Sequence, residues 1–403
     1  MQLTPIIIVA YSGAAEVYMT TIPPASDIRL VFFTNHRIAT NFVKSSLRKN
    51  NTSKQIQERD TSITMTLPST FKAAVFKAQG EPLTLEDLPM KEPGRGELLV
   101  KVEACGVCHS DSFAQNNAFG GGFPLIPGHE IIGRVAAVGP DVSGWEAGQR
   151  VGSGWHGGHD GTCKACNKGL HQMCDNKTIN GITKNGGYAE YCVIRSEAAV
   201  RIPEHVDAAK YAPILCAGVT TYNSMRRQGI AQGETVAIQG LGGLGHLAIQ
   251  YARRMGYHVV AISRGADKEK AARELGAHEY IDAAKDDPAA ALQKLGGAAL
   301  IVATAPHADA ISPLIGGLDI MGKLLLLAVP GPLSVNIAAM LGKGCSVVTW
   351  PSGNALDSEE AIKFTDMQDV DCKIETFPLE KANDAYKVMM DGSVRFRSVV
   401  TMT

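Results

Sequence analysis

Two groups of cysteine, histidine and carboxylate residues in this chain are of the types that bind a transition metal. In the first group, Cys108 is followed after roughly twenty residues by His129, and Cys216 comes much later. A catalytic Zn²⁺ takes three protein ligands, for which two cysteines and one histidine are an accepted set, and leaves the fourth position open. Because these three residues come from distant segments, we expect such an open site. The joint pattern carries this inference, since a single histidine or cysteine is more often a loop or core residue.

The second group is dense in sequence and comprises Asp160, Cys163, Cys166 and Cys174. A carboxylate oxygen binds Zn²⁺ at about 2.0 to 2.2 Å, so one aspartate and three cysteines can form a closed tetrahedral site. The alternatives are a lobe without metal, or ligation by His159 or His171 in place of the aspartate.

The number of cysteines in the whole chain points to a reducing compartment. The chain has nine cysteines, an odd number and far below the density of a disulfide-stapled secreted protein. We therefore interpret the close spacings as metal sites. Cys192, Cys345 and Cys372 are expected to be isolated buried thiols.

A glycine-rich turn predicts a dinucleotide site. The residues Gly240, Leu241, Gly242, Gly243, Leu244 and Gly245 follow the strand pattern TVAIQ and precede the helical pattern HLAIQYARRMG. In such a turn Gly240 permits the tight bend, Gly242 lets backbone N–H groups approach a pyrophosphate, and Gly245 lets the helix pack closely on the strand. The partial positive charge of the helix N-terminus favours the same anion.

The end of the next strand pattern indicates which nicotinamide cofactor is bound. HVVAIS ends at Ser263, where NAD-binding folds usually carry an acidic residue for the ribose 2′-hydroxyl. Ser263, Arg264 and Lys268 would instead accept a 2′-phosphate, so NADP(H) is favoured over NAD(H). The alternative is that both basic residues are solvated and the chain uses either cofactor.

The elements that must position these residues fall into two patterns. From Ala73 to about Val151, short β-rich runs are broken by glycine and proline, which predicts an antiparallel β-domain with long loops. From about Thr235, strand and helix patterns alternate, which predicts a doubly wound parallel sheet. We therefore expect an α/β protein with domains at 67–217, including a lobe at 156–176, and 218–351, with 352–403 returning to the first domain.

Residues 1–66 differ from the rest, with one glycine, fifteen serines and threonines, and seven Lys and Arg against four Asp and Glu. We interpret them as a disordered N-terminal extension, with faint similarity to an organelle-targeting peptide. The whole chain has 39 Lys and Arg against 40 Asp and Glu, which disfavours nucleic acid or anionic lipid as a partner. No apolar stretch is long enough to span a bilayer.

From about Phe71 to the C-terminus, these motifs resemble a zinc-dependent alcohol dehydrogenase of the medium-chain dehydrogenase/reductase family. The resemblance implies a GroES-like β-rich catalytic domain and a Rossmann domain. It implies that Cys108, His129 and Cys216 bind the catalytic zinc and that Glu130 can approach it. It also implies that the second cysteine group holds a structural zinc, with Asp160 in place of the family's first cysteine.

The same resemblance implies roles for further residues around the metal, the cofactor and the substrate. Asp111 would orient His129 and Ser110 would take the substrate proton. His109 would contact the cofactor phosphates, Thr220 the nicotinamide, and Trp155 the substrate. Phe113 also borders the substrate pocket, and it stands where many members of the family have a proton-relaying histidine. We therefore expect slower proton release, from Ser110 through the cofactor ribose to His109 or to water.

The resulting prediction is an enzyme that transfers hydride between NADP(H) and a primary or aromatic alcohol or aldehyde, with two zinc ions per chain. The alternatives are a polyol dehydrogenase, a metal-free quinone or enoyl reductase, and a non-enzymatic binding protein on the same fold. The loop with Phe119 and Phe123 indicates an apolar pocket. The resemblance implies a homodimer or homotetramer, and the cysteine usage favours a cytoplasmic location.

Overall fold

The computed structural model describes residues 7–11, 14–18 and 67–402. The chain separates into two compact units, Met1–Ile63 and Thr64–Thr403. In the first unit, strands β1 (Ile7–Tyr11) and β2 (Ala14–Tyr18) pair antiparallel. The rest of the predicted N-terminal extension, and with it the predicted disorder, lies outside the described residues.

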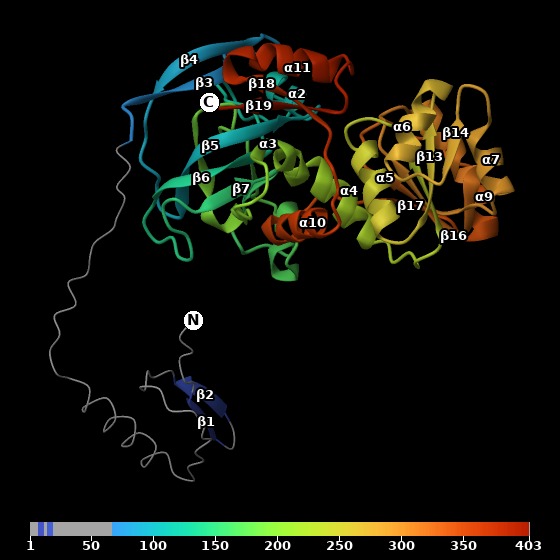
Figure 1. Ribbon diagram of the computed structural model, residues 1–403, viewed down its shortest axis with the longest axis horizontal. Helices are drawn as coiled ribbons and strands as arrows, with labels where there is room; N and C mark the ends of the chain where they lie inside the picture. Colours follow the sequence, from blue (N-terminus) through green and yellow to red (C-terminus); the bar gives the residue numbers. More distant parts are fainter. Residues whose placement is uncertain (1–6, 12–13, 19–66, 403) are drawn as a thin grey trace. The chain divides into compact units, whose positions relative to one another are not determined.

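Within the second unit, the first half is built around a seven-stranded sheet (Figure 1). Its central strand is β5 (Glu97–Val107), which pairs antiparallel with three others. The sheet runs in the order β11-β7-β6-β5-β19-β18, and β10 also pairs with β5. Its other strands are β6 (Ile131–Val138), β7 (Arg150–Ser153), β10 (Tyr191–Arg195), β11 (Val200–Arg201), β18 (Ile374–Pro378) and β19 (Arg397–Thr401).

Two small antiparallel pairs and several helices complete this half. The pairs are β3 (Thr70–Phe76) with β4 (Leu83–Pro89) and β8 (His156–Gly158) with β9 (Thr178–Ile179). The helices are α2 (Asp111–Gln115), α3 (Ala208–Tyr211), α10 (Ala355–Met367) and α11 (Ala382–Met390). One apolar cluster, which includes Phe76, Leu98 and Tyr188, fills the interior.

The second half is a six-stranded parallel sheet in the order β14-β13-β12-β15-β16-β17. Its strands are β12 (Thr235–Gln239), β13 (His258–Ser263), β14 (Glu279–Asp282), β15 (Ala298–Ala303), β16 (Leu318–Leu326) and β17 (Ser346–Thr349). Its helices are α4 (Ala217–Arg226), α5 (Gly245–Arg254), α6 (Glu269–Glu274), α7 (Pro288–Lys294), α8 (Ala308–Ile311) and α9 (Ile337–Lys343).

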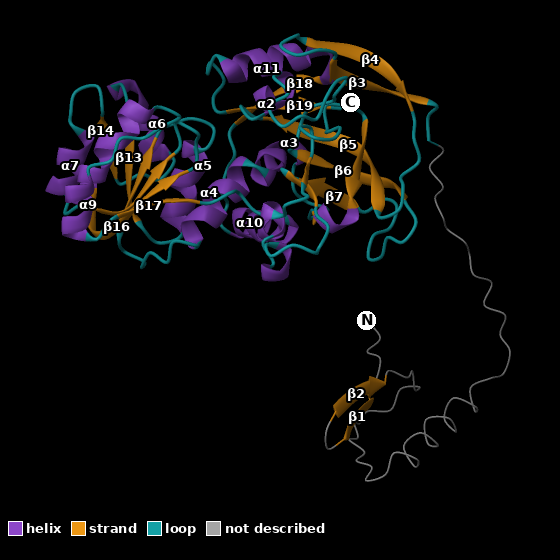
Figure 2. Cartoon of the chain, turned by 180° about the vertical axis from the view of Figure 1, so that it is seen from behind, coloured by secondary structure: helices purple, strands orange, loops and turns teal. Residues whose placement is uncertain are grey.

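Helices cover both faces of this parallel sheet, as the alternating strand and helix patterns predicted (Figure 2). Successive side chains of a strand point to opposite faces. Val236 and Ile238 of β12 accordingly join the apolar cluster that contains Leu247 of α5. Ala237 joins a separate cluster with Leu292 of α7. The predicted doubly wound α/β fold is therefore confirmed.

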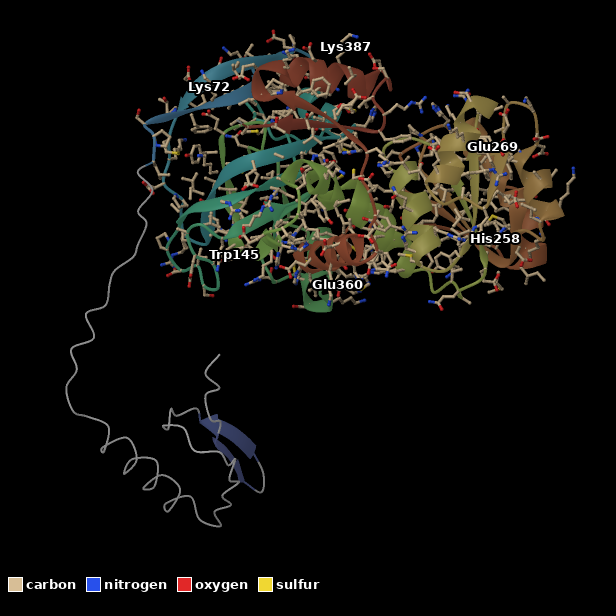
Figure 3. The ribbon with its side chains drawn as sticks, in the orientation of Figure 1. Lys72, Trp145, His258, Glu269, Glu360 and Lys387 are labelled. Carbon is tan, nitrogen blue, oxygen red and sulfur yellow. The ribbon has the colours of Figure 1, made fainter. Side chains whose placement is uncertain are left out.

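The C-terminal segment leaves the parallel sheet and joins the first half. After β17, helix α10 packs on α4, and β19 pairs antiparallel with β5. Figure 3 marks the two halves by labelled side chains: Lys72 and Lys387 lie on the first, and His258 and Glu269 on the second. Among the described residues, no helix has the length and apolar character needed to cross a bilayer.

Candidate active site

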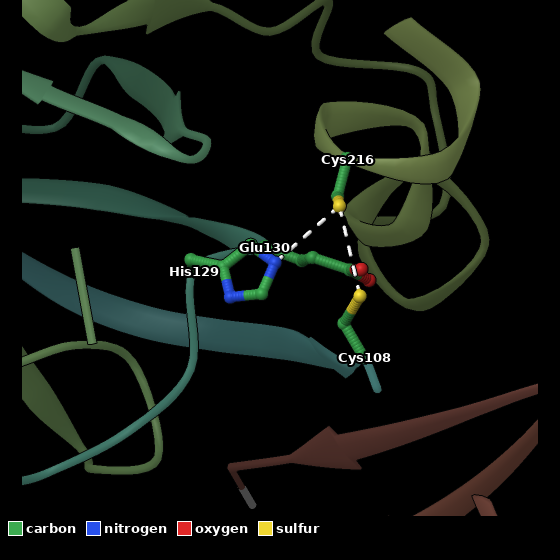
Figure 4. Close-up of side chains that lie close together, drawn as sticks. All are labelled: Cys108, His129, Glu130 and Cys216. Carbon is green, nitrogen blue, oxygen red and sulfur yellow. Dashed lines mark hydrogen bonds between the residues drawn. The ribbon is translucent and has the colours of Figure 1, made fainter. Parts of the chain in front are cut away.

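Four side chains from three segments converge beside the end of β5. Ligand-type atoms of Cys108, His129, Glu130 and Cys216 all lie within 4.8 Å of one another (Figure 4). The sulfur atoms of Cys108 and Cys216 are 3.8 Å apart. The Nε2 atom of His129 lies 3.3 Å from the sulfur of Cys216. The structure thus brings the first predicted metal group together.

The antiparallel pairing of β5 with β6 explains this convergence. Cys105 on β5 pairs with Ile131 on β6, so the chain just after β5 meets the chain just before β6. Cys108 lies on the first of these segments and His129 on the second. Cys216 enters from another direction, as the residue immediately before α4.

The donor set and its spacing fit a tetrahedral zinc ion. Bonds of about 2.3 Å to sulfur and 2.0 to 2.1 Å to nitrogen place two sulfurs about 3.8 Å apart, and sulfur and nitrogen about 3.5 Å apart. The observed separations are 3.8 and 3.3 Å. The hydrogen bond between the two thiols lowers the pKa of Cys108 well below its usual range and raises that of Cys216.

Asp111, at the start of α2, holds the imidazole of His129. Its Oδ1 atom lies 2.9 Å from Nδ1 of His129, and both side chains are fully buried. Nδ1 therefore donates to the carboxylate, which leaves Nε2 facing the two sulfurs. Burial lowers the pKa of His129, but Asp111 and Cys108 together outweigh burial and raise the pKa well above its usual range.

Glu130 is held by an arginine that the sequence analysis missed. Its side chain is fully buried and accepts a hydrogen bond from Nη2 of Arg397 on β19. Burial raises the pKa of Glu130 to about 7, although Arg397 acts in the opposite direction. A Cβ atom on Gly106 would lie 1.8 Å from Oε2 of Glu130, so only glycine fits there.

The other residues assigned by resemblance lie around this cluster. Ser110 is partly buried immediately before α2, and His109 is exposed beside it. Thr220 lies in the first turn of α4, where its N–H donates to the carbonyl of Cys216.

Three aromatic rings form a chain that ends at His129. Trp155 meets the imidazole of His129 edge-on, with ring centres 5.1 Å apart. Phe119 lies 6.0 Å from Trp155, and Phe113 lies 5.6 Å from Phe119. Because Phe119 is half exposed, this aromatic group lies between the metal group and solvent.

The second predicted metal group also comes together. Ligand-type atoms of Asp160, Cys163, Cys166 and Cys174 all lie within 4.8 Å of one another. Oδ1 of Asp160 lies 3.4 Å from the sulfur of Cys174 and 4.0 Å from that of Cys166. A tetrahedral zinc would place oxygen and sulfur about 3.5 Å apart, so the set fits zinc. His159 and His171, the alternative ligands, instead stack on each other with ring centres 3.9 Å apart.

The glycine turn has the geometry that phosphate binding requires. Gly240 has φ +96°, and a Cβ atom on Gly245 would lie 1.8 Å from the carbonyl oxygen of Gly240. A Cβ atom on Gly242 would meet nothing within 4 Å, so that backbone faces open space. Leu244 directly precedes α5. A Cβ atom on Gly243 would lie 3.0 Å from Cδ of Arg397, which brings the turn next to the metal group's arginine.

Ser263 ends β13, and the loop after it carries Arg264 and Lys268. Arg264 is exposed and Lys268 is partly buried. Asp282 lies opposite Ser263 on the neighbouring strand β14, a position that was not predicted from the sequence. Its carboxylate accepts a 2.7 Å hydrogen bond from the N–H of Gly265. The loop is therefore anchored to β14.

Comparisons with known proteins agree with this architecture. Residues 94–204 match the family model of the alcohol dehydrogenase GroES-like domain, and residues 243–368 match that of zinc-binding dehydrogenases. The chain is 65% identical over 337 residues to alcohol dehydrogenase patD of Penicillium expansum, covering 84% of this chain and 99% of the relative.

More distant relatives extend the same likeness. An alcohol dehydrogenase of Geobacillus stearothermophilus is 36% identical over 336 residues, covering 82% of this chain and 99% of that protein. The structure of acetophenone reductase from Geotrichum candidum, solved in complex with NAD, has a TM-score of 0.73 at 26% identity and covers 83% of this chain and 98% of that one.

Proposed function

The chain belongs to the zinc-binding alcohol dehydrogenases of the medium-chain dehydrogenase/reductase family, and on this premise we propose that it transfers hydride between NADP(H) and a primary or aromatic alcohol or aldehyde. The proposal includes two zinc ions per chain. The convergence of Cys108, His129 and Cys216 within bonding range of one ion is the observation that carries it.

Each zinc ion has a proposed set of ligands. Cys108, His129 and Cys216 hold the catalytic ion, with Glu130 close enough to exchange with them. Bound there, zinc supplies a Lewis acid that polarises the substrate oxygen. Asp160, Cys163, Cys166 and Cys174 hold a structural ion that closes the lobe.

We propose that side chains next to this metal group transfer the substrate proton and orient the metal-binding histidine. Oγ of Ser110 takes or returns the proton of the substrate oxygen, and the exposed imidazole of His109 is the adjacent route to solvent. Phe113 has no group that carries a proton, so proton exit is slower than through a histidine. Asp111 keeps His129 in the tautomer whose Nε2 is free to bind metal.

The cofactor is proposed to bind along the glycine turn with its 2′-phosphate at Ser263, Arg264 and Lys268. A nicotinamide cofactor accepts or supplies the hydride itself. Backbone N–H groups at the start of α5 hold the pyrophosphate, and Thr220 adjoins the nicotinamide. The two basic side chains neutralise the extra phosphate, which favours NADPH-driven aldehyde reduction.

The aromatic group of Phe113, Phe119 and Trp155 supports an apolar, planar substrate. Aromatic rings attract one another edge-on or offset, and such a wall prefers an aryl or conjugated carbonyl over a polyhydroxylated chain. A polyol dehydrogenase is therefore disfavoured. A metal-free quinone or enoyl reductase would have no use for the buried cysteine and histidine set.

We further propose that the protein is a dimer or tetramer in a reducing compartment such as the cytoplasm. Several large apolar side chains are exposed on β16, on α9 and between them, including Ile320, Met321, Val329 and Leu341. An apolar surface of this kind often marks a protein interface. All nine cysteines are unpaired with one another, in keeping with reducing conditions.

A panel of aldehydes and alcohols, assayed with both nicotinamide cofactors beside zinc quantification, tests this proposal. We expect two zinc ions per chain and a clear preference for NADPH with aryl aldehydes. Cys163→Ala should lower the zinc content to one per chain while activity is retained. A single zinc ion in the unaltered protein would refute the structural site, and a large preference for NADH would refute the cofactor assignment.

A further inference from the structure

Tyr188 is a fully buried tyrosine whose hydroxyl reaches the carboxylate that orients His129. It lies in the loop that follows β9 and precedes β10, far from the metal group in sequence. Its hydroxyl is 2.7 Å from Oδ2 of Asp111. The burial raises the pKa of Tyr188 well above its usual range, so its hydroxyl is protonated and donates this hydrogen bond.

The contacts of Asp111 explain why this donor matters. Oδ1 serves His129, while Oδ2 accepts from the N–H of Cys108 at 3.0 Å and from Tyr188. Asp111 is fully buried, and a buried carboxylate is stable only when its oxygens are hydrogen-bonded. Without Tyr188, Oδ2 would retain a single described donor, and the carboxylate would be less firmly held.

Tyr188 also supports the backbone next to His129. Its N–H donates to the carbonyl of Pro127, and its own carbonyl accepts from the N–H of Ala74. A Cβ atom on Gly128 would lie 2.4 Å from Cδ1 of the tyrosine ring, so the ring packs directly on this glycine. The hydroxyl of Tyr188 therefore contacts the carboxylate that orients His129, and its ring contacts the residue that precedes His129 in the chain.

We propose that Tyr188 is a positioning residue for the catalytic zinc, acting through Asp111 to fix the imidazole of His129. This inference rests on the proposed catalytic zinc site and goes beyond it, because the described hydrogen bonds of Tyr188 go to Asp111, Pro127 and Ala74 and not to a proposed zinc ligand. Partners of metal-binding histidines typically contribute 10- to 100-fold to metal affinity. Tyr188 is one residue further from the metal than such a partner, because Asp111 lies between Tyr188 and His129.

The test compares Tyr188→Phe with a matched control, Tyr251→Phe. Tyr251 is also fully buried, and its hydroxyl shares a 2.6 Å hydrogen bond with Oγ1 of Thr365, remote from the metal group. Both substitutions remove one buried hydroxyl. For Tyr188→Phe we expect roughly a three- to tenfold faster loss of the catalytic zinc to a chelator, somewhat below the effect of a direct partner. Tyr251→Phe should lose zinc at the unaltered rate.

Two further readouts distinguish positioning from general destabilisation. In cobalt-substituted protein, the ligand-field absorption bands should shift for Tyr188→Phe and not for Tyr251→Phe. In an Asp111→Asn background, adding Tyr188→Phe should change the zinc-loss rate no further, because the tyrosine acts through the carboxylate. Equal zinc loss in Tyr188→Phe and Tyr251→Phe, or additive effects with Asp111→Asn, would overturn the proposal.

The proposal can fail separately from the proposed function. If the unaltered protein holds no zinc at this group, the proposed function fails first. If it holds zinc and Tyr188→Phe loses it at the unaltered rate, only the role of Tyr188 is wrong. Should Tyr188→Phe not fold, 3-fluorotyrosine at position 188 keeps the ring and provides a more acidic donor. Unshifted cobalt bands in that protein would also overturn the proposal.

Discussion

At the scale of single residues, the chemistry depends on a few side chains whose immediate partners determine what they can do. His129 faces the sulfurs because Asp111 occupies its other nitrogen. In the proposed structural zinc site, Asp160 takes the place of a cysteine, and its oxygen lies 3.4 Å from the sulfur of Cys174. In the proposed cofactor site, Ser263 would place no negative charge beside a 2′-phosphate, which an acidic side chain would repel.

Replacing Ser263 with aspartate tests the cofactor assignment. A carboxylate at the end of β13 would repel a 2′-phosphate and accept a hydrogen bond from a ribose 2′-hydroxyl. We expect the ratio of kcat/KM for NADPH over NADH to fall by roughly tenfold or more, given the strength of charge-assisted contacts. Steady-state kinetics with both cofactors measure this ratio. An unchanged ratio would mean that the 2′ position of the ribose lies elsewhere.

Shortening Phe119 tests the proposed substrate wall. Phe119→Ala removes the ring between Phe113 and Trp155, and an aromatic pair of this kind contributes about 0.5 to 1.5 kcal/mol beyond simple burial. We expect kcat/KM for benzaldehyde to fall by roughly three- to tenfold, with a smaller change for acetaldehyde. Equal losses for both aldehydes would contradict a role in substrate preference.

At the scale of elements, the start of α5 joins the glycine turn to the C-terminal segment. His246 stacks on Phe396 with ring centres 4.7 Å apart, and its Nε2 accepts from the N–H of Lys373. Burial lowers the pKa of His246 to about 3. In the unfolded chain, His246 has the ordinary histidine pKa of about 6.5. The unfolded chain therefore takes up a proton that the folded chain does not, and the free energy of unfolding decreases as the pH falls below about 6.5.

Removing this histidine should therefore flatten the dependence of stability on pH. As the pH falls from about 6.5 to 5, the extra proton that the unfolded chain binds at His246 rises from about half a proton to nearly one, and the slope approaches ~1.4 kcal/mol per pH unit. We expect the free energy of unfolding of His246→Gln to depend less steeply on pH. Proton uptake by all other groups should be the same in the variant and in the unaltered protein. Denaturant unfolding across this range measures the slope. Parallel curves would show that folding does not lower the pKa of His246.

The elements themselves could be predicted from local pattern, and several partners in the site could not. The alternation of strands and helices and the glycine turn are signals within short windows of sequence. Arg397, in contrast, lies 267 positions from Glu130, in a segment with no pattern that points to a buried ion pair. Tyr188 and Asp282 were missed for the same reason, because only the folded sheet shows which side chains meet.

At the scale of the whole molecule, several large apolar side chains are exposed on the half with the parallel sheet. Among the described residues of a single chain, no surface covers them. Val329 and Leu341 are each 82% exposed, which is costly in water unless another surface covers them. β17 is also the terminal strand of its sheet. An edge strand without charged side chains is prone to pair with another chain.

Analytical ultracentrifugation of the protein and of Leu341→Glu tests whether this surface joins copies of the chain. We expect a mass that is two or four times 42.8 kDa for the unaltered protein. We expect a shift toward smaller species at micromolar concentration for the variant, because a buried unpaired charge destabilises an interface. An exposed site elsewhere, such as Lys387→Glu, serves as control. A monomeric unaltered protein would contradict the prediction.

The proposed oxidoreductase activity depends on one zinc ion that Cys108, His129 and Cys216 share. Zinc content and NADPH-dependent aldehyde reduction, measured together on the unaltered protein and on Cys216→Ser, test it most directly. The predicted result is two zinc ions and activity in the former, with one zinc ion and at least a hundredfold lower kcat in the latter, about the contribution that electrostatic stabilisation typically makes. Retention of both zinc ions, or of full activity, in Cys216→Ser would contradict it.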